Sequence, residues 1–339
     1  MNIALAYSDQ GTVAALTAAL DGLEYRLAWA VKTGAEAIRR MEQQPVDVLL
    51  LSVRISDMTA ADATRRLLSH ASCAIILLAE TTGLELSSVY DAMGAGAQDV
   101  VSAPRLDARG RVLGHEALLA KLRTAARLRG SPGRMSVAHT ATSAPTDAAP
   151  IQLVAIGAST GGPQALFTIL CALPRPFGAA ILMVQHVDSE FSSGLAAWLE
   201  SGSGIRVSLA QNGQAPEVGV ALLASSSDHL VMMAGGTLRY RPEPRELIHR
   251  PSVDVLFASL AEHWRRPAVA ALLTGMGRDG AEGMKKLRVA GWHTIAQDEA
   301  TSVVYGMPKA AVQLGAVSKI LPLAQIAGEI ARHVAHRGI

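Results

Sequence analysis

The sequence has few cysteines, almost no net charge and no long apolar run. Its 339 residues include two cysteines, Cys73 and Cys171, and both lie in apolar patterns typical of buried, unreactive thiols. A formal net charge of +2 gives no basic stripe of the kind that nucleic-acid-binding proteins carry. No apolar run reaches the roughly 18 residues of a membrane span, and the N-terminal residues MNIALAYSDQ lack the pattern of a signal peptide. We therefore expect a soluble, cytoplasmic protein that neither binds nucleic acid nor inserts into a membrane.

Half of the residues are hydrophobic, and in the first part of the chain they form short apolar strands that alternate with segments of helical periodicity. The predicted strands here are Ile3–Tyr7, Arg26–Val31, Val46–Leu51, Ala74–Ala79 and Ala97–Val101. A last helix is predicted over His115–Arg127. This alternation predicts a parallel sheet with helices on both faces. Residues 1–128 are therefore expected to form a first α/β domain.

A change of composition separates this part from the rest of the chain. Residues 129–150 are rich in small residues and proline and show no apolar period, so we predict a flexible linker. The alternation then resumes, and the predicted strands are Ile151–Ile156, Ala180–Val184, Val218–Leu223, His229–Met233, Ala268–Leu273 and His293–Ala296. We expect a second α/β domain over residues 151–339, and therefore two doubly wound parallel-sheet domains.

The strongest local signal is the segment GASTGG at residues 157–162, which stands between an apolar strand and a helical segment. It matches G-x-S-x-G, a pattern that places a serine, here Ser159, on a sharp strand-to-helix turn. Two other interpretations stay open. The segment could be a glycine-rich turn without a nucleophile, or a dinucleotide-binding loop, although that pattern needs a glycine where Ser159 stands.

A serine nucleophile needs a base, and the position of the histidines along the strands narrows the choice. In open α/β sheets, reactive groups gather beyond the carboxyl ends of the strands. Of the ten histidines, His186 satisfies this rule best, because only Gln185 separates it from the strand predicted over Ala180–Val184. His229 and His293 begin predicted strands, which places them at the opposite end. His249 lies in a loop and is a distant second candidate.

The base must itself be oriented by a third group, and two aspartates follow predicted strands. Asp279 lies in the glycine-containing loop after Ala268–Leu273, and Asp298 follows the strand at His293–Ala296. A lone loop aspartate is usually a turn or capping residue. The presence of all three residue types at strand ends favours a Ser159–His186–Asp279 triad, with Asp298 as the competing acid.

Several segments from Ile151 onward resemble the catalytic domain of chemotaxis protein-glutamate methylesterases. In the order of that family they are VAIGASTGG at 154–162, VQH at 184–186, HRPSVDVLF at 249–257, LTGMGRDGAEG at 273–283 and AQDEATSVVYGMP at 296–308. The first domain resembles a flavodoxin-type response-regulator receiver, the usual N-terminal partner in the family. The resemblance therefore covers both predicted domains.

This resemblance implies roles for particular residues. Ser159 would be the nucleophile, His186 the general base and Asp279 its orienting carboxylate. Thr160 would hydrogen-bond the histidine, and the backbone amide of Met276 would donate to the oxyanion. The implied reaction is hydrolysis of glutamyl methyl esters on the cytoplasmic helices of methyl-accepting chemoreceptors, and many members of the family also deamidate glutamine. No metal or cofactor is implied. The alternative is a catalytically silent adaptor of the same pathway.

The receiver-like domain departs from the pattern that phosphorylation requires. A working receiver needs an acid pair that holds magnesium, an aspartate that accepts phosphate, a hydroxyl and a lysine. The corresponding residues here are Ser8-Asp9, Ser52, Ala79 and Ala103. Asp57 lies well into the loop after Ser52, so it is a poor substitute. We predict a receiver fold that lacks the phosphorylation site and that serves as an interaction or covering domain, with other chemosensory proteins as candidate partners.

Overall fold

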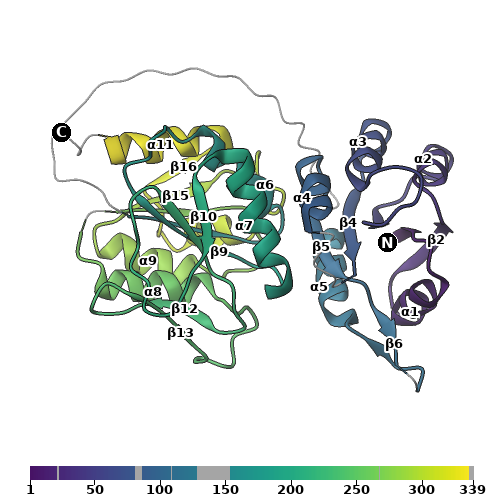
Figure 1. Cartoon of the computed structure of the whole chain (residues 1–339), viewed down its shortest axis with the longest axis horizontal. Coiled ribbons are helices and arrows are strands. Elements are labelled where there is room, and N and C mark those ends of the chain that lie inside the picture. Colours follow the sequence, from purple (N-terminus) through teal and green to yellow (C-terminus); the bar gives the residue numbers. More distant parts are fainter. Residues whose placement is uncertain (21–22, 81–85, 108, 128–152, 267, 336–339) are drawn as a thin grey trace. The chain divides into compact units, whose positions relative to one another are not determined.

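The chain forms two compact units, Met1–Pro132 and Gly133–Ile339, and each is described here by itself (Figure 1). The computed structural model describes the whole chain except residues 21–22, 81–85, 108, 128–152, 267 and 336–339. The linker predicted over residues 129–150 lies outside the described residues. Each unit contains a parallel sheet with helices on both faces, so the predicted α/β class with two doubly wound sheets is confirmed.

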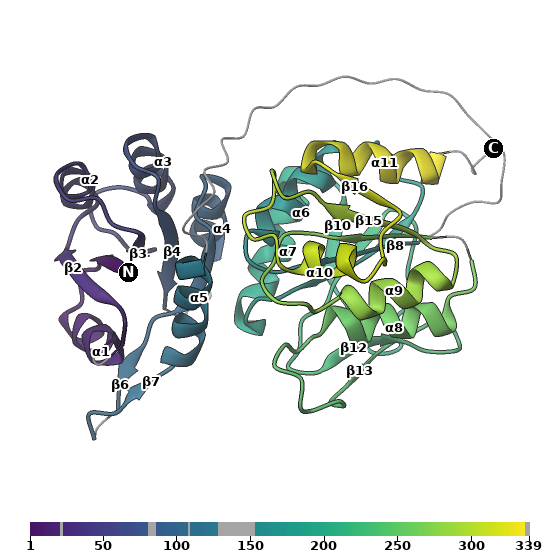
Figure 2. The same cartoon turned by 180° about the vertical axis from the view of Figure 1, so that it is seen from behind.

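The first unit contains a five-stranded parallel sheet in the order β2-β1-β3-β4-β5. Its strands are β1 (Asn2–Ala6), β2 (Arg26–Val31), β3 (Val48–Ser52), β4 (Ala74–Ala79) and β5 (Asp99–Ser102). Its helices are α1 (Gln10–Leu20), α2 (Gly34–Gln43), α3 (Ala60–His70), α4 (Leu86–Gly94) and α5 (His115–Arg127). Leucines of α1 and α5 share one buried cluster with the strands, while α2, α3 and α4 pack side by side (Figure 2). A short hairpin, β6 (Arg105–Leu106) and β7 (Val112–Leu113), joins β5 to α5.

The second unit contains a seven-stranded parallel sheet in the order β10-β11-β9-β8-β14-β15-β16. These strands are β8 (Leu153–Ala158), β9 (Ala180–Gln185), β10 (Arg206–Leu209), β11 (Val220–Leu223), β14 (Val269–Leu272), β15 (His293–Gln297) and β16 (Lys319–Leu321). Every residue of β8, β9 and β14 is buried, because these central strands are covered on both faces.

Helices form a layer on each side of this sheet. On one side, α6 (Gly162–Ala172) packs against α7 (Ser189–Ser203) and α11 (Leu323–Ala335). On the other, α9 (Ala281–Val289) packs against α8 (Val253–His263) and α10 (Met307–Gln313), as Figure 2 shows. An antiparallel hairpin, β12 (His229–Met232) and β13 (Leu238–Arg241), packs against α8 outside the sheet. Among the described residues, no helix combines the length and the apolar character needed to cross a membrane.

The two edge strands of the second sheet were not predicted from the sequence, and one predicted strand was assigned to the wrong sheet. The edge strands β10 and β16 are short, and each begins with an exposed charged residue, so neither has a long apolar run. The strand predicted over His229–Met233 exists, but it pairs with β13 in the antiparallel hairpin and is not part of the parallel sheet. This difference matters for the site, because the rule about carboxyl strand ends does not apply to β12.

Candidate active site

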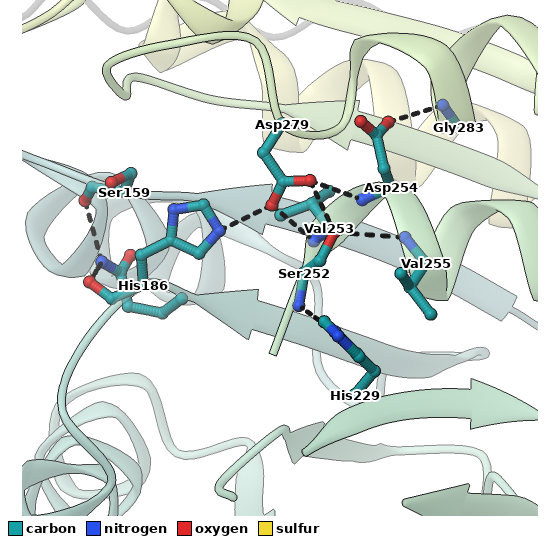
Figure 3. A network of polar contacts seen from close by, with 10 residues as sticks. Ser159, His186, His229, Ser252, Val253, Asp254, Val255, Asp279 and Gly283 are labelled. Carbon is teal, nitrogen blue, oxygen red and sulfur yellow. Dashed lines mark hydrogen bonds and ion pairs between the residues drawn. The ribbon is translucent and has the colours of Figure 1, made fainter. Parts of the chain in front are cut away.

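The residues that the sequence singled out lie at the carboxyl ends of three adjacent strands. In the sheet order, β8 lies between β9 and β14. Ser159 directly follows β8, and His186 directly follows β9, where Ala158 is paired with Gln185. Asp279 lies in the loop between β14 and α9. Neighbouring parallel strands therefore bring a hydroxyl, an imidazole and a carboxylate to one edge of the sheet (Figure 3).

Ser159 occupies the turn that joins β8 to α6. The turn is completed by Gly161, whose φ of 76° is a left-handed conformation that favours glycine. The backbone amide of Ser159 donates to the carbonyl oxygen of Thr274 at 3.0 Å, which ties the turn to the end of β14. Ser159 is 5% exposed. Within the described part of the chain, its hydroxyl has no hydrogen bond, so it is available to a substrate.

His186 lies between Ser159 and Asp279 and is hydrogen-bonded to the carboxylate (Figure 3). Its Nε2 lies 2.7 Å from Oδ2 of Asp279, and because an ionised carboxylate only accepts, Nε2 carries the proton. The other ring nitrogen, Nδ1, is buried and has no hydrogen-bond partner among the described residues. In the neutral ring, Nδ1 therefore holds the lone pair that a general base needs.

The exposed imidazole of His249 lies over the ring of His186. The two rings are nearly parallel, with centroids 4.1 Å apart and planes inclined by 8°. His249 therefore does not replace His186 as the group bound to Asp279. The His249 ring covers one face of the His186 ring, which is bound to Asp279.

Asp279 accepts hydrogen bonds from the beginning of α8 as well as from His186. Its Oδ1 accepts from the hydroxyl of Ser252 at 2.6 Å, and its Oδ2 accepts from the backbone amide of Val253 at 2.7 Å. The amide of Asp254 adds a contact of 3.0 Å to Oδ1. Burial alone would raise the pKa of Asp279, but the hydrogen bond and charge of His186 and these donors hold that pKa well below its ordinary value. The carboxylate is thus ionised and fixed in orientation.

Asp254 is a second carboxylate beside Asp279. Its Oδ1 accepts the backbone amide of Gly283 at 2.6 Å, so it binds the first turn of α9. Burial raises the pKa of Asp254 to about 6, and the negative charge of Asp279 adds to the increase.

Gln185, the last residue of β9, connects the backbones of Ser159 and His186. Its side-chain nitrogen donates to the carbonyl oxygen of Ser159 at 2.8 Å and to that of His186 at 3.2 Å. The residue is buried. Two carbonyl acceptors fix the orientation of the amide, because the reverse orientation would oppose oxygen to oxygen.

The other two candidates, Asp298 and Thr160, form contacts other than those expected with His186. The carboxylate of Asp298 accepts from the amide and hydroxyl of Thr301, at 3.0 and 2.6 Å, so it closes a local turn and does not contact His186. The expected hydrogen bond between Thr160 and His186 is not formed in the described structure, where the carbonyl of Thr160 accepts from the hydroxyl of Thr274.

Met276 follows Gly275 in the loop after β14, and this loop approaches Ser159. A Cβ added to the neighbouring Gly275 would lie 2.8 Å from Cβ of Ser159. The carbonyl of Gly275 accepts from the amides of Gly306 and Met307, at 3.0 and 2.9 Å, which holds the loop in place. The loop therefore presents the backbone of Met276 near Ser159 without room for a side chain at residue 275.

Two residues near the proposed triad, Ser252 and His229, were not predicted from the sequence as part of the site. Ser252 caps the N-terminus of α8, accepting from the amide of Val255 at 3.3 Å, while its own hydroxyl donates to Asp279. His229 is fully buried behind Ser252 and accepts its backbone amide. The signal for Ser252 was the cap position before an apolar helix. His229 had been set aside because it begins a strand.

A second cluster of potential ligands lies at the opposite end of the sheet. His293, Glu329 and His333 approach closely enough to be considered for a metal ion. However, the buried carboxylate of Glu329 already pairs with Lys319 at 2.8 Å and with Arg332, and burial, which would raise its pKa, is outweighed by these cations. The two imidazoles stack with centroids 3.8 Å apart, so their lone pairs do not converge. We assign no metal to this cluster.

In the first unit, Ser52, which the sequence analysis aligned with the phosphate-accepting position of a receiver, and the nearby Asp57 are engaged in other contacts. The hydroxyl of Ser52 accepts the amide of Arg54 at 3.1 Å. The guanidinium of Arg54 pairs with Glu80 at 3.2 Å, and Glu80 also accepts from the hydroxyl of Tyr7 at 3.3 Å. Asp57 accepts the amides of residues 34 and 35, at 2.7 and 2.9 Å, so its carboxylate anchors the beginning of α2.

The chain is similar to several known proteins. The family model described as CheB methylesterase matches residues 154–330. A protein-glutamate methylesterase/protein-glutamine glutaminase of Cupriavidus metallidurans is 46% identical over 96% of both chains, and one of Burkholderia lata is 48% identical over 91% of both. The crystal structure of the Thermotoga maritima CheB methylesterase catalytic domain is 35% identical, with a TM-score of 0.52, and covers 53% of this chain and 97% of its own.

Proposed function

The chain belongs to the CheB methylesterase family and is a methylesterase of bacterial chemotaxis, and from this premise we propose that Ser159, His186 and Asp279 form its catalytic triad. The proposed substrates are glutamyl methyl esters on the cytoplasmic helices of chemoreceptors. The contact that carries the assignment is the 2.7 Å hydrogen bond between His186 and Asp279, at the strand end next to Ser159.

In the proposed reaction, the hydroxyl of Ser159 attacks the ester carbonyl carbon while Nδ1 of His186 takes its proton. The resulting imidazolium is stabilised by Asp279, which keeps its own negative charge. Collapse of the tetrahedral intermediate breaks the bond to the methoxy oxygen, which leaves as methanol with the proton from His186. A water molecule, deprotonated by the same imidazole, then hydrolyses the acyl-enzyme to glutamate.

The negative charge on the intermediate needs donors that are already in place. We assign one of them to the backbone amide of Met276, because its loop is fixed against Ser159. The orienting role of Thr160 rests on the family resemblance alone.

The same acyl-enzyme would form from a glutamine side chain, with ammonia leaving in place of methanol. Deamidation is therefore part of the proposal, and it agrees with the printed names of the two similar enzymes. A catalytically silent adaptor has no observation in its favour, since the hydroxyl, imidazole and carboxylate are all present at adjoining strand ends.

The first unit is proposed to act without accepting phosphate. Ser52 has no carboxylate to phosphorylate, and Arg54 and Glu80 pair in its neighbourhood. Its surface would instead bind other proteins of the chemosensory pathway.

The test is methanol release from a methylated receptor cytoplasmic fragment, with the full chain and its Ser159→Ala variant. The substitution removes one hydroxyl from a backbone in which no described non-glycine residue has a positive φ, so the fold should be kept. We expect turnover to fall to background with an unchanged circular dichroism spectrum. Near-normal methanol release by the variant would refute the assignment of the nucleophile.

A further inference from the structure

Both ring nitrogens of His229, the first residue of β12, are hydrogen-bonded inside the protein. Its Nε2 lies 3.0 Å from the carbonyl oxygen of Pro244. Its Nδ1 lies 3.1 Å from the backbone nitrogen of Ser252, the contact that Figure 3 shows. The residue is 0% exposed, so no water competes for either nitrogen. Such complete satisfaction indicates that the ring is held in one orientation.

These partners also determine the tautomer of His229. A carbonyl oxygen can only accept, so Nε2 must carry the hydrogen, and a backbone amide can only donate, so Nδ1 must carry the lone pair. The ring is therefore neutral. A second proton, on Nδ1, would set one N–H group against another and break the contact with Ser252.

The two partners of His229 are the ends of one segment, residues 244–252. This segment carries His249, whose ring stacks on His186 with centroids 4.1 Å apart. A single buried imidazole thus fastens both ends of the segment that covers the proposed base.

Ser252 connects this imidazole to the carboxylate of the site. While its amide is bound by His229, its hydroxyl donates to Oδ1 of Asp279 at 2.6 Å. Because the next amides along α8 also donate to Asp279, a displacement of Ser252 would move several of its donors together.

We propose that His229 is a positioning residue of the active site, which fixes Ser252 and through it orients Asp279 against His186. His229 touches none of the reacting atoms, so its effect is expected in kcat more than in KM. The inference rests on the proposed function, because it gives Asp279 the role of the triad carboxylate.

Two substitutions in the full chain test separately the hydrogen bonds made by the two ring nitrogens of His229. In His229→Asn, the side-chain oxygen takes the approximate place of Nδ1 and can still accept from Ser252. In His229→Gln, the amide nitrogen takes the approximate place of Nε2 and can still donate to Pro244, but the acceptor for Ser252 is lost. The matched control is His293→Asn, because His293 also begins a strand and is also bound through Nε2, to Glu329 at 2.9 Å.

The measurements are kcat and KM for methanol release, the melting temperature, and the downfield proton NMR resonance of the His186–Asp279 hydrogen bond. We expect His229→Gln to lower kcat by up to about 100-fold, as a misplaced catalytic group does, and to shift or abolish the resonance. His229→Asn should keep the resonance and retain about tenfold more activity than the glutamine variant, the value of one retained hydrogen bond. The His293 control should change the melting temperature alone.

The NMR resonance needs no substrate, so it separates the two proposals. If the wild-type chain released no methanol, the proposed function would be overturned while the resonance still tested His229. Wild-type kcat and resonance in both variants would overturn the inference. The inference would also be overturned if His229→Gln and His229→Asn lost the same fraction of kcat and this loss followed the fall in melting temperature, since that result indicates a merely structural role. If the glutamine variant does not fold, Ser252→Ala replaces it, and an unchanged kcat there would overturn the inference.

Discussion

Asp279, in the loop before α9, accepts backbone amides from the start of α8, and Asp254, in the first turn of α8, accepts a backbone amide from α9. Asp279, just before α9, accepts the amide of Asp254 in the first turn of α8 at 3.0 Å, and Asp254 accepts the amide of Gly283 in α9 at 2.6 Å. Both carboxylates thus accept from a helix N-terminus, which favours negative charge, but for Asp254 burial outweighs this effect and raises the pKa. This exchange fixes the beginnings of α8 and α9 relative to each other and sets the position of the proposed triad carboxylate.

Asp279→Asn should lower turnover by up to about four orders of magnitude, the loss that such a change causes in other triads. The amide can present a donor to His186, which would reverse the hydrogen bond and leave the wrong ring nitrogen protonated. The measurement is kcat for methanol release, with circular dichroism to show that the variant is folded. Asp298→Asn is the control, and it should cause only a mild loss because Asp298 binds Thr301. A severe loss of kcat in Asp298→Asn, together with a mild loss in Asp279→Asn, would assign the role of the orienting carboxylate to Asp298.

Asp254→Asn should stabilise the protein at neutral pH. Burial raises the pKa of Asp254 to about 6, so the folded state binds its proton more tightly than the unfolded state, whose carboxyl has the ordinary value of 3.8. The stability from this group is therefore fully present below pH 3.8 and is lost as the pH rises through about 6. Asparagine carries no charge and can still accept from Gly283.

The measurement for Asp254 is the melting temperature of both proteins from pH 4 to pH 7.5. We expect the variant to melt higher at pH 7.5, and the difference to disappear towards pH 4. A variant that melts lower than the wild type throughout this range would show that the charge of Asp254 is needed by the fold.

Gln185→Glu should reduce turnover because it removes both donors that hold the carbonyls of Ser159 and His186. The new carboxylate would oppose two carbonyl oxygens in a buried position, so we expect kcat to fall by about 100-fold. Protonation of the glutamate restores one O–H donor, so part of the activity should return as the pH is lowered, relative to the wild-type profile. Parallel pH profiles for the two proteins would argue that Gln185 does not position the catalytic backbone.

The sequence could place the three residues of the proposed triad at one edge of the sheet because each of them follows a buried parallel strand. The apolar runs before Ser159 and His186 mark β8 and β9 clearly, and the topology of parallel sheets then places both residues at one edge. The residues alone favoured Asp279 but left Asp298 as the competing acid, because both follow a strand. The contact with His186 depends on where α8 and α9 meet, which no local pattern encodes.

The parts that could not be predicted depend on contacts between distant segments. His229 was excluded by a rule for parallel sheets, whereas β12 belongs to an antiparallel hairpin that reaches the site from outside. The short edge strands β10 and β16 had no long apolar run to mark them. Predicting these features requires knowing which elements pack together, and that information is not local in the sequence.

The last prediction concerns the first unit, which should not respond to small phosphodonors. Ser52 cannot form an acyl phosphate, and its hydroxyl accepts the amide of Arg54. The carboxylate of Asp57 is bound to two amides at the beginning of α2, so it is not a substitute acceptor. We expect incubation with magnesium and acetyl phosphate to leave both the intact mass and the methylesterase activity unchanged.

Ser52→Asp alone should not create the response. The new carboxylate would lack the usual lysine, because Ala103 stands in its place, and would lack the hydroxyl that Ala79 replaces. It would also lie next to the Arg54–Glu80 ion pair, whose glutamate repels a second negative charge. The matched measurement is the intact mass and activity of this variant under the same conditions. A gain of mass equal to one phosphate, together with higher turnover in either protein, would show that the receiver-like unit still accepts phosphate. Without that gain, we expect any control of the esterase to come from proteins that bind this unit or from docking of the receptor, since a ligand shifts an equilibrium through its different affinity for the two states.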